Sequence, residues 1–116
     1  MIKIAYAPIY KYQLPKGHRF PMVKYELLPE QLLYEGTVTE AQFFGPDRLK
    51  EEVLLWTHTQ TYWQKLQTQQ LDRKEERAIG FPLRPDLIER GRHIAMGTIQ
   101  CALYAQQYGV ALNIAG

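Results

Sequence analysis

The sequence has one cysteine, no long apolar run and no cluster of charges of one sign. Its single cysteine, Cys101, cannot form an intramolecular disulfide, and the first residues lack the apolar core of a signal peptide, so we expect a cytoplasmic protein. No apolar stretch approaches membrane-spanning length, so no membrane partner is expected. The 14 lysines and arginines are scattered among 12 acidic residues, which excludes the basic patch typical of nucleic-acid binding.

Several motifs of known chemistry are also missing. There is no G-x-G-x-x-G, no P-loop and no G-x-S-x-G, so dinucleotide binding, phosphoryl transfer and serine-hydrolase chemistry lack support. The residues that could bind zinc do not have the spacing of a zinc motif: His18, His58, His93 and Cys101. We therefore expect no metal site within the chain.

What is present is a globular composition, with 46% hydrophobic and 22% charged residues. The length fits one domain, residues 1–116, with no internal boundary. Three apolar stretches are typical of strands: Ile2–Tyr6, Glu52–Trp56 and Val110–Ala115. Because helical segments separate them, the pattern predicts an α/β fold with right-handed crossovers and a parallel sheet.

A long helix is predicted from Pro85 to Tyr108. Proline suits its first turn, and Gly109 suits the position just past its end. Two interior glycines, Gly91 and Gly97, each cost about 1 kcal/mol against alanine, so we expect a packing reason for both. The apolar residues at helical spacing predict the face toward the core: Leu87, Ile88, Ile94, Ala95, Thr98, Ile99, Ala102, Leu103 and Ala105.

Three shorter helices are predicted upstream. An apolar face begins at Met22, Pro29 is expected to restart this helix as a first-turn residue, and Gly36 ends it. Thr57 with Gln60 fits a capping box for a helix through Leu66. Asp72 and Glu75 fit another capping box, for a short helix over 73–78.

Few polar residues stand out as functional candidates. Arg19 lies among aromatic and apolar neighbours, and it is either a surface arginine or part of a site. His58 follows the second predicted strand, where catalytic groups occur, although a histidine bonded to backbone at a helix start is the simpler interpretation. Cys101 is expected in the core, His93 is expected in solvent, and the charges at Glu89 and Arg90 are expected on a solvated helix face.

Five segments, taken together, resemble the amino-terminal part of the histone deacetylase superfamily, closest to its bacterial class IV-like members. The segments follow in order along the whole chain: Ile4–Tyr10, Gly17–Tyr25, Thr57–Trp63, Arg77–Pro82, and Gly97–Ile99 with Asn113–Gly116. The resemblance implies an arginase-like, three-layer α/β/α fold, here incomplete, with its first strand between the other two. It also implies a hydrolase that uses zinc to cleave acyl amides on lysine or polyamines.

In that family the zinc ligands, the paired histidines and the carbonyl-polarising tyrosine lie beyond the glycine that matches Gly116. Loops after parallel strands carry the chemistry, so we expect a truncated sequence that stops before its active site, with no catalytic residue, no bound cofactor and no activity alone. The resemblance places Arg19 and Tyr6 at the internal channel and Phe81 at the substrate rim. Pro82 stands where other classes have a substrate-binding aspartate, which weakens the case for histone-like peptides.

Two other functions remain open. The chain could be a stand-alone, non-catalytic interaction module derived from that fold, and the open edge of an incomplete sheet would then favour self-association. Metal binding through the three histidines has little support from their spacing.

Overall fold

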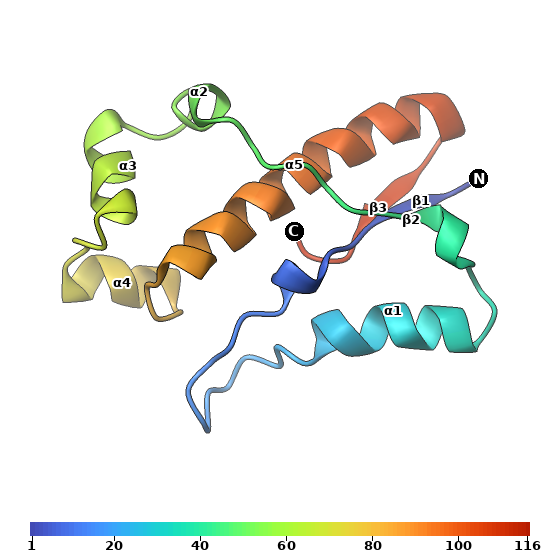
Figure 1. The fold of residues 1–116 in the computed structure, drawn as a ribbon, viewed down its shortest axis with the longest axis horizontal. Coiled ribbons are helices and arrows are strands. Elements are labelled where there is room, and N and C mark those ends of the chain that lie inside the picture. The colour runs from blue at the N-terminus through green and yellow to red at the C-terminus, as the bar shows by residue number, and fades with distance from the viewer.

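A computed structural model describes residues 1–116 and is mixed α/β, with five α-helices and a small parallel sheet (Figure 1). The strands are β1 (Lys3–Ala5), β2 (Phe43–Phe44) and β3 (Ala111–Asn113). Their order is β2-β1-β3, and both pairings are parallel. The prediction of a parallel sheet with its first strand in the centre is therefore confirmed.

The second strand was expected in the wrong place. Residues 52–56 do not form a strand, because α2 (Glu51–Leu54) and a turn occupy them, and Trp56 is 76% exposed. Two glutamates in the first turn suit the positive end of a helix, which explains why a short apolar run is helical here. The true strand, β2, has only two residues and follows the short 3₁₀ helix η2 (Glu40–Gln42), so it is too short to show a period.

Helix α1 (Lys24–Tyr34) runs unbroken through Pro29. The expectation that this proline restarts the helix was wrong: it lies in the helix interior and is buried. Gly36 follows the helix end at φ 73°, as expected of a glycine that stops a helix. Upstream, the segment after β1 contains the 3₁₀ helix η1 (Pro8–Tyr10), and the side chains of Tyr10 and Tyr12 are almost fully buried.

Helices α3 (Gln60–Gln67) and α4 (Arg73–Ile79) meet at a steep angle near the first half of α5 (Figure 1). The capping box of α4 is present as predicted, between Asp72 and Glu75. The cap of α3 is Thr59 rather than Thr57, because only Thr59 lies three residues before the free N–H of Tyr62.

Helix α5 (Pro85–Tyr108) has the predicted bounds, and Gly109 ends it at φ 92°. Its predicted core face is only partly correct, since five of the nine residues are exposed: Ala95, Thr98, Ile99, Ala102 and Leu103. The stripe that packs inward has spacings of three and four and includes a charged residue: Leu87, Arg90, Ile94, Gly97 and Cys101. The predicted solvated position of Arg90 was therefore wrong, because it is 8% exposed.

The two helix glycines differ in their surroundings. A Cβ at Gly97 would lie 2.6 Å from Tyr10 Oη and 2.9 Å from Asn113 Nδ2, so the predicted packing reason is confirmed there. A Cβ at Gly91 would meet no atom within 4 Å, so close packing does not explain that glycine.

None of the helices combines the length and the apolar composition that a membrane-spanning helix needs.

Candidate functional site

A hydrogen bond joins the loop after β1 to the end of β3, at the carboxyl edge of the sheet. Tyr10 Oη donates a 2.7 Å hydrogen bond to Asn113 Oδ1. The Asn113 amide in turn donates to Ile94 O at 3.0 Å and to Thr98 Oγ1 at 3.1 Å, both on α5. Because Gly97 has no side chain, α5 can approach closely enough for these bonds. One asparagine thus joins the loop, the strand and the helix.

The Tyr10 phenol is a proton donor in this network. Burial is the main cause that raises its pKa to about 12, so it stays protonated near neutral pH. Its hydroxyl already donates to Asn113, and its backbone carbonyl accepts a 2.7 Å bond from Arg90 Nε. A phenol held in this way positions the loop and is not poised to accept a proton.

An aromatic cluster lies beside this network and joins the loop to the end of α4. Phe81 is its centre, with its ring centroid 5.1 Å from Phe20, 5.8 Å from His18 and 6.1 Å from Tyr12. Phe20 also stacks on Tyr25 of α1 at 6.0 Å. These rings, together with the buried core around Tyr10, form one continuous hydrophobic cluster.

His18 bridges the same two segments through both ring nitrogens. Its Nδ1 accepts from Phe20 N–H at 3.1 Å, and its Nε2 lies 3.1 Å from Gly80 O. An Nδ1 that accepts leaves the proton on Nε2, so the bonds assign the neutral tautomer. Neither nitrogen is left to bind a metal ion in this arrangement.

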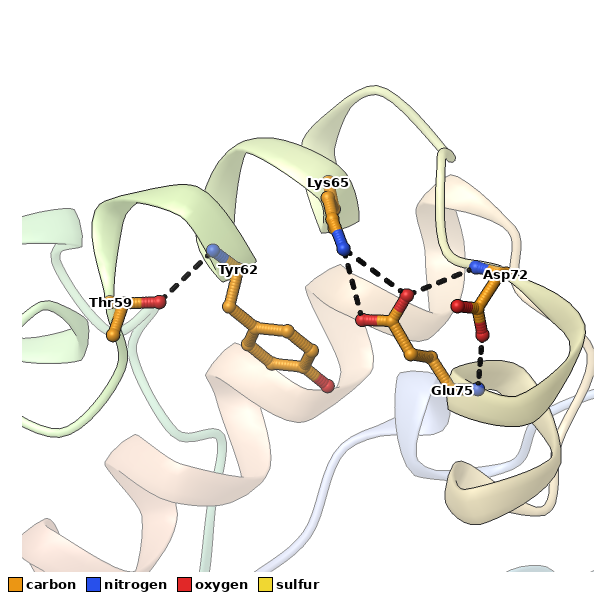
Figure 2. A network of polar contacts seen from close by, with 5 residues as sticks. All are labelled: Thr59, Tyr62, Lys65, Asp72 and Glu75. Atoms are coloured by element: carbon orange, nitrogen blue, oxygen red, sulfur yellow. Dashed lines mark hydrogen bonds and ion pairs between the residues drawn. The ribbon is translucent and has the colours of Figure 1, made fainter.

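Polar contacts join α3 to α4, the helix that precedes Phe81 (Figure 2). Asp72 and Glu75 exchange hydrogen bonds in the capping box of α4. Lys65 of α3 reaches the same Glu75 carboxylate at 3.3 and 3.4 Å. Gly80, at φ 87°, then turns the chain toward the loop. Phe81 follows this glycine directly, and its ring contacts Tyr12, His18 and Phe20.

The structure brings the predicted site residues together only in part. Phe81 contacts His18 and Phe20, the two neighbours of Arg19. Arg19 itself is exposed and belongs to none of the ion pairs. Tyr6 is half-buried, and its ring centroid lies 6.1 Å from that of Tyr10 and 6.3 Å from that of Phe43. Its ring contacts are therefore with these two residues and not with Phe81.

No three His, Cys, Asp or Glu side chains come close enough together to hold a metal ion. His58 is exposed and lies beside the Tyr62 ring, whereas His93 Nδ1 lies 3.1 Å from Pro46 O instead of in solvent. Cys101 is buried as predicted, its Sγ lies 3.2 Å from Leu112 O, and burial raises its pKa. The residues present therefore do not fit a zinc centre.

Two buried arginines were missed in the sequence. Arg90 donates its Nε–H to Tyr10 O at 2.7 Å, and Arg92 donates its Nε–H to Leu49 O at 2.8 Å. A signal for Arg90 existed, because it occupies the stripe Leu87, Arg90, Ile94, at spacings of three and four. Both arginines line a groove of about 630 Å³ between α5 and the helices α2 and α3.

No family model matches the chain. A protein from Picosynechococcus sp., described as uncharacterized, is 33% identical over 113 residues. The match covers 97% of this chain but only 38% of that protein. The chain thus spans well under half the length of the curated relative that it resembles.

Proposed function

We propose that this chain is the amino-terminal portion of a cytoplasmic, zinc-dependent deacetylase with the three-layer, arginase-like fold. The resemblance in sequence is the origin of this proposal, and the greater length of the Picosynechococcus protein is compatible with it. The substrates would be acyl amides on lysine or on polyamines. The zinc-dependent step would require groups other than those described above, because the residues present do not fit a zinc centre.

One structural observation supports the proposal most directly. Segments that carry the resemblance meet in a single hydrophobic cluster, although they are far apart in the sequence. Four of the five segments contribute: Tyr10, Tyr25 and Ala115 belong to its buried part, and Phe81 packs against them, whereas the segment Thr57–Trp63 lies outside the cluster. This cluster lies at the carboxyl end of the parallel strands, the edge where α/β proteins bind their ligands.

Within this proposal the chain supplies part of a channel wall. The exposed, unpaired guanidinium of Arg19 is free to bind a carboxylate such as a departing acetate. Phe81 and Tyr6 would supply apolar and aromatic surface on either side of the Tyr10 core. The residues of this chain would therefore bind and orient, and would not perform the hydrolysis.

A chimera tests the proposal. This chain would replace the matching 113 residues of the Picosynechococcus protein, and the chimera would be assayed with acetyl-lysine peptides and acetylpolyamines. We expect hydrolysis that a zinc chelator abolishes, and a loss of at least about tenfold in Arg19→Ala or Phe81→Ala. Absence of hydrolysis by both the chimera and the intact relative would overturn the proposal, as would zinc-dependent hydrolysis by this chain alone.

The surface of the chain favours a second candidate, a non-catalytic module that self-associates. The accessible surface is 7778 Å², against about 6,600 Å² expected for a compact monomer of this mass. The radius of gyration, 15.7 Å, also exceeds the roughly 13 Å of a compact domain. Sedimentation over a range of concentrations would show a dimer if this candidate is correct, and a monomer throughout would reject it.

A further inference from the structure

The groove beside α5 has the size and lining of a small-molecule site. Its volume of about 630 Å³ falls within the range of roughly 300–1,000 Å³ typical of ligand pockets. Of its 17 lining residues, 12 are hydrophobic. An apolar stripe of α5 forms one wall, with Ile88, Gly91, Ala95 and Ile99 at helical spacing. The open space at Gly91 is part of this groove.

Two guanidinium groups border the groove on either side of Gly91. Arg90 and Arg92 are only 8% and 9% exposed, and neither belongs to any of the four ion pairs. Arg90 lies 5.8 Å from the centre of the Phe81 ring, and Arg92 lies 5.5 Å from the centre of the Trp63 ring. Both rings line the groove.

Buried cations without an acidic partner are costly. Burial lowers the pKa of Arg90, which means that its charged form is disfavoured where it stands. The facing rings and the single backbone carbonyl that each Nε–H binds offset only part of this cost. The pKa of Glu89 is lowered chiefly by its hydrogen bonds to Arg48 and to a smaller degree by the charge of Arg92. Its carboxylate forms its ion pair with Arg48 and not with Arg92.

We propose that this groove binds a small carboxylate with an apolar body, such as a medium-chain fatty acid. The carboxylate would pair with the guanidinium group of Arg92, which lies on the same face of α5 as the apolar stripe. The chain would lie along Ile88, Ala95 and Ile99. Charge complementarity selects the head group, because arginine binds carboxylates through paired hydrogen bonds. The apolar stripe selects the body, because burying it removes apolar surface from water. This site is independent of the proposed deacetylase.

Trp63 provides the readout, since it lines the groove and contacts Arg92. Replacing the exposed Trp56 by phenylalanine leaves Trp63 as the only tryptophan. The purified Trp56→Phe protein would be titrated with decanoate below its micelle concentration and, separately, with decanol. We expect saturable fluorescence change with decanoate, and binding of decanol weaker by about tenfold or more. Equal responses to the acid and the alcohol, or none, would overturn the proposal.

Gly91 offers a blocking variant that leaves the arginines in place. Gly91→Leu would fill the groove and lower decanoate affinity at least about tenfold, whereas Gly91→Ala would change it by about twofold or less. Equal, parent-like binding by both would overturn the proposal. Arg92→Gln should reduce the preference for decanoate over decanol. If the chimera with the Picosynechococcus protein loses decanoate binding, the rest of that longer chain covers the groove, and the proposal fails.

Discussion

Tyr10 Oη donates a 2.7 Å hydrogen bond to Asn113 Oδ1, and 103 residues separate the two in the sequence. Both side chains would collide with any side chain at position 97. The loop after β1, the strand β3 and the middle of α5 are therefore held in register by one contact. The first three predictions concern this contact and the residues around it.

Tyr10→Phe should destabilise the protein by about 1 kcal/mol, because it removes the only donor to Oδ1 of the half-buried Asn113. Chemical denaturation monitored by circular dichroism would measure the change. Tyr34→Phe is the matched control, since Tyr34 is 88% exposed and should tolerate the change. Equal stability of the two variants would show that the hydrogen bond contributes nothing.

Stability should fall at alkaline pH through Tyr10. Its pKa is raised from 10.0 to about 12 in the folded protein, so the folded state holds this proton more tightly than the unfolded state. The resulting stabilisation is complete below pH 10 and is lost as the pH rises toward about 12. Denaturation midpoints across this interval should fall more steeply in the parent than in Tyr10→Phe, and parallel curves would contradict this assignment.

Gly97→Ala and Gly91→Ala should change stability in opposite directions. The added methyl group at position 97 would overlap Tyr10 Oη and Asn113 Nδ2, and we expect a loss of about 1–3 kcal/mol despite the better helix propensity of alanine. The same change at position 91 meets open space and should gain up to about 1 kcal/mol. Thermal melting of the pair compares the two directly, and a shared sign would refute the packing argument.

Asp72→Ala should cost about 1 kcal/mol by removing the side-chain cap of α4. Arg73→Ala, at the neighbouring position, has no capping contact and serves as the control. Because α4 carries the turn before Phe81, the capping variant should also increase amide exchange at Gly80 and Phe81. If the variant destabilises the helix but leaves amide exchange at Gly80 and Phe81 unchanged, the cap does not stabilise the turn before the aromatic cluster.

The ends of α5 could be predicted from the sequence because proline and glycine mark helix ends through local sterics alone. The position of β2 could not, because a strand of two phenylalanines has no period, and its place depends on pairing with Ile4 and Ala5. The apolar run after Glu52 has the length of either element, and its exposed Trp56 becomes informative only once the fold is known.

The candidate site was predictable to a similar degree. Residue type and local sequence drew attention to Phe81 and to the segment around Arg19, and the structure packs Phe81 against the neighbours of that arginine. The burial of Arg90 and Arg92 was not predictable from charge, which favours the surface. Their place follows from carbonyl acceptors on Tyr10 and Leu49, distant residues that only the tertiary structure brings near.

The central position of β1 has a consequence for the order in which the protein is made. This strand leaves the ribosome before its two partners, and it pairs with residues 43–44 on one side and residues 111–113 on the other. Long-range pairings of this kind form slowly, and an unpaired strand invites contact with other chains. Until residues 111–113 have been made, the nascent chain therefore carries a central strand with one unpaired edge, open to contact with other chains.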